Sequence, residues 1–105
     1  MIAEKTAKQI YTVSQITQDI KLILENSFQG VWVEGEVSNF RPNTSAHFYF
    51  SLKDEASVLS AAMFNWANKE AKFKLEDGLK VVCFGRINVY PPHGKYQLVI
   101  ERIEP

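Results

Sequence analysis

Aromatic and basic residues share one face of a predicted strand over residues 47–53. His47, Tyr49 and Lys53 occupy alternate positions there, with apolar residues between them, which is the period of a half-buried strand. A turn over residues 90–96, with two prolines and a glycine, carries the same kinds of side chain. Aromatic rings stack on unpaired bases and cations attract phosphates, so such a face is suited to single-stranded nucleic acid.

The candidate binding residues are expected on the outer face of the second and third strands of a barrel and in two flanking loops. They are all aromatic or basic: Arg41, His47, Tyr49, Lys53, Phe64, Arg86, Tyr90, His93 and Lys95. A purely structural interpretation stays open for several of them. Tyr49 could cover hydrophobic wall, and Phe64 could pack beneath a short helix. Arg41 and Lys95 could be solvated loop charges.

Catalytic and metal-binding patterns are absent from the sequence. The chain has two histidines, His47 and His93, and one cysteine, Cys83, and these are not at metal-ligand spacing. No glycine-rich phosphate loop precedes a helix. Glu34 and Glu36 share one strand face, but we interpret them as solvated charges rather than as a paired-carboxylate site. We therefore expect no catalytic residue, no metal and no cofactor in this chain.

The composition indicates a single domain with no excess of basic charge. Hydrophobic residues make up 46% of the 105 residues, enough for one core. Twelve basic and twelve acidic residues give a net charge of zero, which argues against a dedicated nucleic-acid domain. Residues 38–53 and 78–100, however, contain basic residues and no acidic ones. The lone cysteine and the lack of a signal peptide or membrane-spanning run predict a cytoplasmic protein.

The turn signals divide most of the chain into strands of a mainly β domain. Five strands are predicted, over residues 31–40, 47–53, 57–64, 79–90 and 95–103. A short helix is expected between the third and fourth strands, over residues 65–72. That order of elements is typical of the five-stranded Greek-key barrel known as the OB-fold. Gly35 and Gly85 are expected where long strands bend to close the barrel, and Cys83 is expected in its core.

An amphipathic helix is predicted over residues 12–27, after a flexible arm over residues 1–10. Thr12 and Gln15 are spaced as a capping box. Four apolar residues form one stripe along the helix: Ile16, Ile20, Ile23 and Leu24. Such a stripe predicts a helix that lies on a larger surface, within a single domain over residues 11–105. The tryptophans are expected to pack, Trp32 against this helix and Trp66 at the end of the barrel.

Three segments together resemble the N-terminal domain of the large subunit of exodeoxyribonuclease VII. They are YTVSQITQDIKLILENSF, then VWVEGEVSNF with HFYFSLKD and AAMF, and EDGLKVVCFGRINVYPPHGKYQLVIE. The resemblance covers about residues 11–103. Its most specific motifs are WVEGEVSNF, HFYFSLKD and Y-x-P-x-G-x-Y-Q-L, which follow in the family's order and spacing.

The resemblance implies a non-catalytic OB-fold domain that grips single-stranded DNA for a nuclease whose active site lies elsewhere. The parent enzyme degrades single-stranded DNA to oligonucleotides and pairs a large subunit with several small subunits. Its catalytic region and small-subunit contact would follow Pro105. The family's binding surface would correspond to His47, Tyr49, Lys53, Phe64, Arg86 and residues 90–96.

The chain departs from the family pattern at several positions where arginine is common. These are Ser60, residues 65–68 and His93. Each lost cation removes a phosphate contact, so the isolated domain is expected to bind weakly and in a salt-sensitive way. A second interpretation is a barrel that docks protein, either the rest of its own subunit or a partner. Trp32 and the zero net charge favour that alternative, while a self-contained enzyme is disfavoured.

Overall fold

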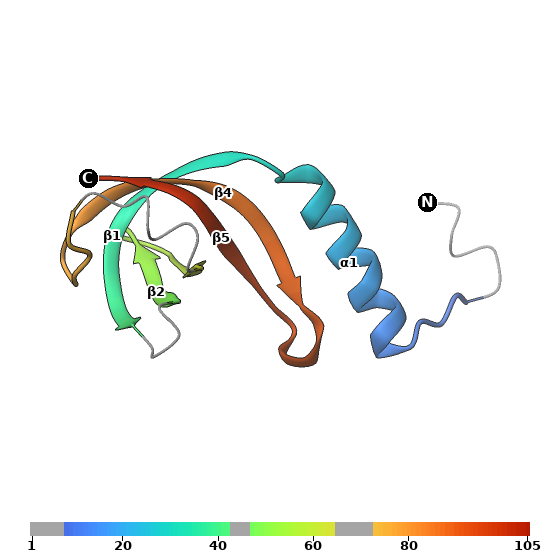
Figure 1. Ribbon diagram of the computed structural model, residues 1–105. Helices are drawn as coiled ribbons and strands as arrows, with labels where there is room; N and C mark the ends of the chain where they lie inside the picture. The colour runs from blue at the N-terminus through green and yellow to red at the C-terminus, as the bar shows by residue number, and fades with distance from the viewer. Residues whose placement is uncertain (1–7, 43–46, 65–72) are drawn as a thin grey trace.

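The computed structural model describes residues 8–42, 47–64 and 73–105. These residues form a helix, α1 (Val13–Ser27), and the strands β1 (Val31–Pro42), β2 (Phe48–Lys53), β3 (Val58–Met63), β4 (Lys80–Tyr90) and β5 (Lys95–Glu104), with a 3-10 turn, η2 (Pro91–His93), between β4 and β5. The strands close into a barrel in the order β1-β2-β3-β5-β4 (Figure 1). All five predicted strands are confirmed, with ends that differ by at most two residues.

Two features of the prediction stay untested. The short helix expected over residues 65–72, with Trp66, lies outside the described residues, as does most of the predicted arm. The Greek-key connection also stays a prediction.

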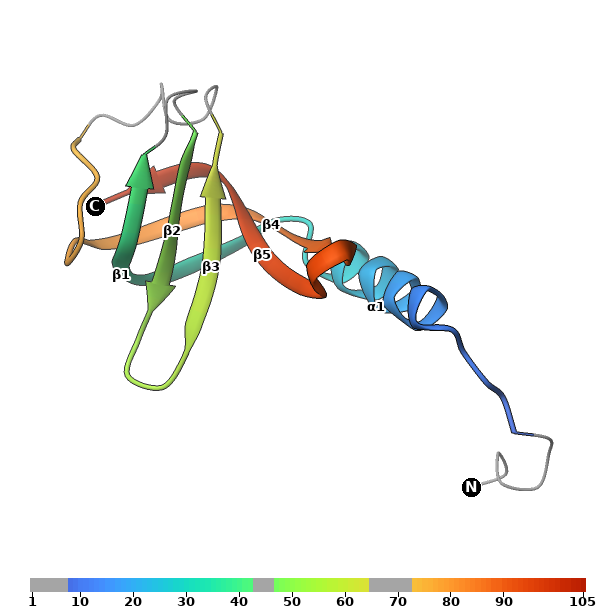
Figure 2. The same cartoon turned by 90° about the horizontal axis from the view of Figure 1, so that it is seen from below.

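The first strand is long enough to pair with a different neighbour at each end. Residues 31–36 pair with β4 and residues 36–42 pair with β2. Figure 2 shows β1, β2 and β3 side by side, with β4 and β5 crossing behind them. The barrel closes where β3 meets β5 in parallel, at Ala61 opposite Leu98 and Ala62 opposite Val99.

Gly85 allows β4 and β5 to approach each other at the closing bend. The strand register shifts between Phe84 and Gly85, as in a β-bulge. A Cβ atom at Gly85 would lie 2.1 Å from the carbonyl oxygen of Val99. No side chain fits in that space, so glycine is required there, in agreement with the predicted bend.

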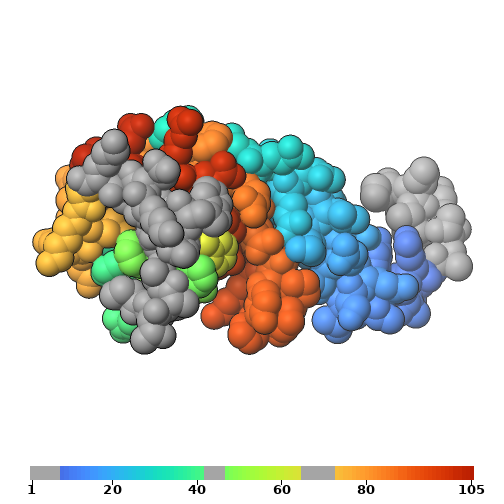
Figure 3. Space-filling view, in the orientation of Figure 1, coloured from blue at the N-terminus to red at the C-terminus, as the bar shows by residue number. Residues whose placement is uncertain are grey.

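Helix α1 begins as the sequence predicts. Gln15 N donates to Thr12 Oγ1 over 3.0 Å and Thr12 N donates to Gln15 Oε1 over 2.9 Å, which completes the capping box. The helix lies beside β4 and η2 and extends away from the barrel (Figure 2). In the space-filling view, the β4–β5 hairpin projects between the barrel and α1 (Figure 3).

The prediction that the apolar stripe of α1 lies on a larger surface is wrong for most of the stripe. Ile16, Ile20 and Ile23 are 40%, 46% and 65% exposed, and only Leu24 is half-buried against the barrel. The helix is held instead by a polar contact near its C-terminal end. Glu25 Oε2 accepts hydrogen bonds from β4, including one from Val89 N over 3.0 Å. This contact turns a polar side of the helix toward the barrel and leaves the stripe in solvent.

Trp32, expected against the helix, makes its ring contact with Phe84 of β4. The two ring centroids lie 5.0 Å apart, and Trp32 stays 51% exposed. Its exposed face is therefore available for another molecule.

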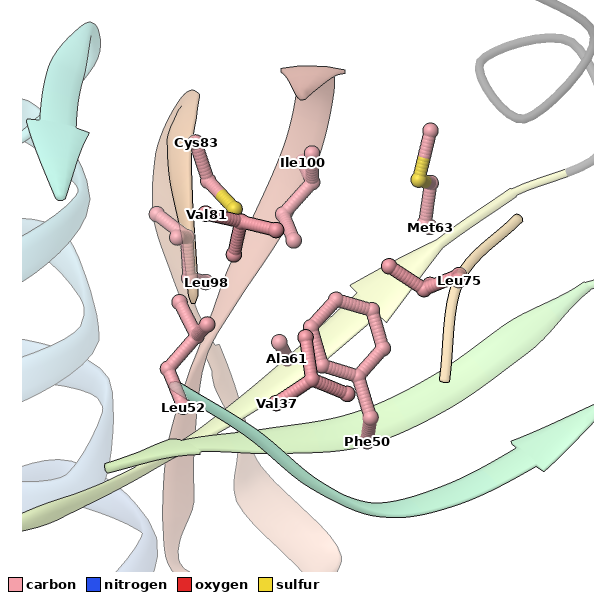
Figure 4. Packing of buried hydrophobic residues seen from close by; sticks show 10 residues of the cluster. All are labelled: Val37, Phe50, Leu52, Ala61, Met63, Leu75, Val81, Cys83, Leu98 and Ile100. Atoms are coloured by element: carbon pink, nitrogen blue, oxygen red, sulfur yellow. The ribbon is translucent and has the colours of Figure 1, made fainter. Parts of the chain in front are cut away.

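The core lies inside the barrel and comes from inward residues of every strand, together with Leu75 before β4. Figure 4 shows its side chains pointing toward one another: Val37, Phe50, Leu52, Ala61, Met63, Leu75, Val81, Cys83, Leu98 and Ile100. Cys83 is fully buried, as predicted, and burial raises the pKa of its thiol to about 12. The inward positions of the strands thus build the core, and the outward positions of β2 and β3 are left to form a surface.

Candidate nucleic-acid interface

A groove of about 310 Å³ lies where the outer face of β2 and β3 meets the β4–β5 hairpin. Five of the predicted binding residues line it: Tyr49, Phe64, Tyr90, His93 and Lys95. Ser60, Tyr96 and Gln97 complete the lining. The groove is rich in aromatic rings, which are the side chains that stack on unpaired bases.

The register of β2 and β3 brings the rings on these strands together. Tyr49 lies opposite Ala62, a small residue that is fully buried. Phe64 follows β3, with its ring centroid 6.4 Å from that of Tyr49 and 5.2 Å from that of His47. Both contacts are edge-to-face, and Tyr49 remains 40% exposed. Tyr49 and Phe64 form a ring wall on one side of the groove, and His47 packs against Phe64 from outside the groove.

The hairpin contributes the opposite wall through a tight turn. Gly94 adopts a left-handed backbone, with φ of 59°, and its N–H donates to the Pro91 carbonyl over 3.1 Å. The turn folds His93 back onto Tyr90, with ring centroids 5.0 Å apart. It also starts β5 at Lys95, directly opposite Tyr90. A cation and exposed rings are thus held on one short, rigid element.

A bulge in β1 aligns Arg41 with this surface. The register shifts between Ser38 and Arg41, and Asn39 takes a positive φ of 53°, which asparagine tolerates better than most residues. Phe40 N donates to Asp77 Oδ1 over 2.9 Å. The result is that Arg41 lies directly opposite Tyr49 in the β1–β2 pairing, so both side chains lie on the same face of the sheet.

Two of the predicted cations lie away from the groove. Lys53 Nζ is 3.9 Å from Glu36 Oε2, and Arg86 Nη1 is 3.3 Å from Glu101 Oε2. Lys53 also borders a wide hollow of about 740 Å³ that is rich in carboxylates: Glu34, Glu36, Asp54 and Glu55. Among the described residues, Arg41 and Lys95 have no such carboxylate partner. Arg41 and Lys95 therefore keep their charge available near the rings, and the acidic hollow is unfavourable for phosphates.

Reasoning from the residue pattern missed Ser60 and Gln97 as groove residues, whereas Tyr96 lies in residues 90–96, which the family resemblance had placed in the binding surface. Tyr96 was predicted on one face of the strand with Leu98 and Ile100, but β5 extends past the barrel there and leaves Tyr96 56% exposed. Gln97 follows the outward alternation of β5, which would have placed it beside the predicted residues. Neither Ser60 nor Gln97 carries a charge or a ring, so the search for cations and rings passed over them.

The family model that matches this chain describes an OB-fold nucleic acid binding domain, and the match covers residues 11–104. The chain belongs to this family of OB-fold domains. That membership agrees with the closed five-stranded barrel and with the helix before its first strand.

Curated relatives of this OB-fold domain confirm the resemblance that the motifs indicated. Exodeoxyribonuclease 7 large subunits from Nitratiruptor sp., Campylobacter fetus and Pasteurella multocida are 49%, 44% and 39% identical to it. The matches cover 91%, 90% and 94% of this chain but 23%, 24% and 22% of the relatives. The chain therefore spans about a quarter of their length and matches their N-terminal part.

Solved structures share the fold at low sequence identity. One belongs to a replication protein A heterotrimer bound to single-stranded DNA, with a TM-score of 0.60 and 12% identity over 73% of this chain and 57% of that one. Another is the SSB domain of a Synechococcus protein, with a TM-score of 0.58 and 12% identity over 73% of this chain and 94% of that one. Asparaginyl-tRNA synthetase from Pyrococcus horikoshii gives a TM-score of 0.61 and 17% identity over 94% of this chain and 22% of its own. At these identities the likeness establishes the barrel alone.

Within the described part of the domain, no cluster of three histidine, cysteine, aspartate or glutamate residues is arranged to hold a metal ion. None of its helical residues form a segment long and apolar enough to span a membrane.

Proposed function

We propose that this OB-fold domain binds single-stranded DNA in the groove between β2, β3 and the β4–β5 hairpin. The observation that carries the proposal is the convergence of half-exposed rings and unpaired cations on one surface. Tyr49, Phe64 and Tyr96 line the groove with Lys95, and Arg41 lies opposite Tyr49 on the neighbouring strand. Neither cation has a carboxylate partner among the described residues. Stacked bases contribute roughly 1–3 kcal/mol each, so a few rings suffice for useful affinity.

Single strands fit this surface better than duplex DNA does. Rings can stack only on bases that are not already stacked and paired, so the ring wall has no partner in a duplex. Duplex binding would depend on phosphate contacts alone. The domain has a net charge of zero and an acidic hollow at the far end of β2, so that contribution is small.

In the longer proteins that this chain resembles, the domain would hold single-stranded DNA for a nuclease region. We propose a non-catalytic role for it, because the groove is lined mainly by aromatic rings together with Lys95, which are the groups that bind bases and phosphates. The nuclease region and the contact with small subunits would then belong to other parts of the large subunit. This proposal agrees with the relatives' name and with the quarter of their length that the chain spans.

The test is fluorescence anisotropy of a labelled oligo-dT at low and then moderate salt, with duplex DNA of equal length as a control. We expect saturable single-strand binding that weakens with salt, and much weaker duplex binding. The double variant Tyr49→Ala, Phe64→Ala should lower the affinity by at least tenfold. Tyr11→Ala removes an exposed ring from the start of α1 and is the matched control. Equal affinity for single and double strands, or no loss in the double variant, would contradict the proposal.

Protein docking is the second candidate function, and one observation favours it. A hollow of about 590 Å³ lies between the end of α1 and the barrel, and its lining is almost wholly apolar. Leu24, Val58 and Ile87 are among its lining residues, and Val58 is 68% exposed. Undiminished oligonucleotide binding in the double variant of Tyr49 and Phe64 would make docking the better interpretation.

A further inference from the structure

A chain of polar side chains runs from α1 through β4 to the groove on β5. Its first member is Glu25, whose Oε2 accepts hydrogen bonds from Lys21 Nζ over 2.6 Å and from Val89 N over 3.0 Å. The same oxygen accepts a third bond from Asn88 Nδ2 over 3.1 Å. Asn88 Oδ1 in turn accepts a longer bond from Gln97 Nε2 over 3.5 Å. Gln97 lines the groove, so the last member of the chain reaches the binding surface.

The carboxylate at the start sets the direction of every bond in this chain. An ionised carboxylate only accepts hydrogen bonds, whereas a primary amide has one end that donates and one that accepts. Glu25 therefore requires the NH₂ end of Asn88, and the Asn88 carbonyl is turned toward Gln97. Gln97 must then offer its own NH₂ end to Asn88. Its carbonyl oxygen Oε1 has no protein partner among the described residues.

A second polar group of defined chemistry faces the same groove. Ser60 on β3 is exposed and lines the groove together with Gln97 and the rings of Tyr49 and Tyr96. Its hydroxyl can both donate and accept. A base held by the rings would therefore meet an acceptor at Gln97 and an adaptable hydroxyl at Ser60.

We propose that the groove distinguishes bases by their edges and prefers an exocyclic amino group beside an unprotonated ring nitrogen. Cytosine and adenine carry this pattern; the amino group would donate to Gln97 Oε1 and the ring nitrogen would accept from Ser60. Uracil and thymine place a carbonyl where cytosine has its amino group, and two carbonyl oxygens flank their single N–H. In the same pose the O4 carbonyl would face the Gln97 carbonyl oxygen, with no hydrogen bond between the two acceptors. This inference rests on the proposed function, since it assigns a base preference to the same groove.

Cytosine and uracil differ at this edge but not in ring size, so they provide the sharpest comparison. Anisotropy with labelled oligo-dC and oligo-dU of equal length, at pH 8, should show oligo-dC binding about three- to tenfold more tightly, which is the range of one net hydrogen bond. Gln97→Met keeps the length of the side chain but removes the acceptor. It should bind both oligonucleotides, with affinities that differ by less than about twofold.

A variant in α1 tests whether Glu25 sets the direction of the hydrogen bonds that link it to Asn88 and Gln97. Glu25→Gln replaces an obligate acceptor by an amide, so Asn88 and Gln97 are free to turn. The preference for oligo-dC should shrink although residue 25 does not touch the groove. Lys80→Ala, at the opposite end of the barrel, is the control and should keep the wild-type ratio. Circular dichroism of each variant establishes that the barrel is folded.

The outcomes separate this inference from the proposed function. Equal wild-type affinity for oligo-dC and oligo-dU, or a preference retained in Gln97→Met, would overturn the base preference and leave single-strand binding intact. Failure of the wild-type chain to bind either oligonucleotide at low salt would overturn both. The wild-type comparison needs no variant, so it decides the matter even where a substitution disturbs folding.

Discussion

Two lysines that the sequence analysis placed among the binding residues occupy opposite electrostatic environments in the structure. Lys53 lies beside Glu36 at the acidic end of β2, whereas Lys95 borders the ring-lined groove. Only a cation without a nearby carboxylate can give its full attraction to a phosphate, because a paired one must first lose its partner. An exposed ion pair contributes about 0.2–1 kcal/mol. The position of a lysine on this barrel therefore matters more than its presence.

We expect Lys95→Ala to lower the affinity for oligo-dT about two- to fivefold, and Lys53→Ala to lower it by less. Anisotropy titrations of the two variants in the same low-salt buffer make the comparison. A larger loss for Lys53→Ala would mean that the DNA crosses the far end of β2, as the sequence alone suggested.

The thiol of Cys83 is another residue whose behaviour follows from its surroundings. Burial in the core raises its pKa to about 12, and the thiolate is the reactive form. We expect negligible reaction with a thiol-specific reagent at pH 8 in the native state and complete reaction in denaturant. The absorbance of the chromophore that the reagent releases measures the reaction in the native state and in denaturant. Fast native modification would show that the core around Cys83 opens readily.

Among the elements, α1 is held beside β4 by a small set of polar contacts, and Glu25 accepts two of them, from Asn88 and Val89. Lys21 Nζ also donates to the Val89 carbonyl over 3.2 Å, and Ile87 N donates to the Phe28 carbonyl over 2.9 Å. The hydrogen bond from Lys21, and then that from Val89, lower the pKa of Glu25 below its ordinary value of 4.5. A carboxyl group with a lowered folded-state pKa contributes stability above the unfolded-state pKa and loses it as pH falls through the folded-state value. The docking of α1 should therefore be constant from pH 7 to 5 and weaken below about 4.5.

Hydrogen exchange of the α1 amides is the measurement for this element. Glu25→Ala should raise their exchange at pH 7 and should remove the additional rise in acid. Asp19→Ala, an exposed acid on the same helix, should change neither. Other carboxyl groups also titrate in this range, so the comparison is between variant and wild type at each pH. An unchanged exchange rate in Glu25→Ala would mean that contacts other than those of Glu25 hold the helix.

The closing bend of the barrel makes a second prediction for an element. Gly85→Ala would place a methyl group 2.1 Å from the Val99 carbonyl oxygen, so β4 and β5 would have to separate. We expect a loss of about 3 kcal/mol or more in the free energy of unfolding. A Cβ atom at Gly94 would meet no atom within 4 Å, but the backbone there has a φ of 59°. Gly94→Ala should therefore lower the free energy of unfolding by about 1 kcal/mol. Urea denaturation of both variants gives the comparison, and a similar loss in the two would contradict it.

The elements were predictable from the sequence because each has a local signature, but the register between strands and the side of α1 that faces the barrel were not. Alternation located the strands to within two residues, and the spacing of Thr12 and Gln15 located the start of α1. The pairing of Lys53 with Glu36 depends on the register between β1 and β2, which no local pattern specifies. The stripe of α1 also indicated an amphipathic helix, yet the hydrogen bonds of Glu25 decide which side faces the barrel.

Across the whole molecule, charge is arranged by position although it sums to zero. The acidic hollow includes Glu34, Glu36, Asp54 and Glu55, and the rings with Lys95 line the groove. A strand of DNA would be attracted at the groove and repelled at the hollow, so the neutral total hides a surface with a preferred binding region. Few phosphates can be neutralised there, and stacking has to supply most of the affinity.

The salt dependence of binding measures how many phosphates are neutralised. On single strands, the logarithm of the binding constant falls with the logarithm of salt concentration by about 0.7 per phosphate contact. Arg41 and Lys95 provide two candidate contacts, so we expect a slope of about −1.4. Lys95→Ala should reduce it to about −0.7, whereas Lys80→Ala should leave it unchanged. A slope steeper than about −3 would require cations outside the groove to contact the DNA, and stacking on the ring wall would then no longer dominate the affinity.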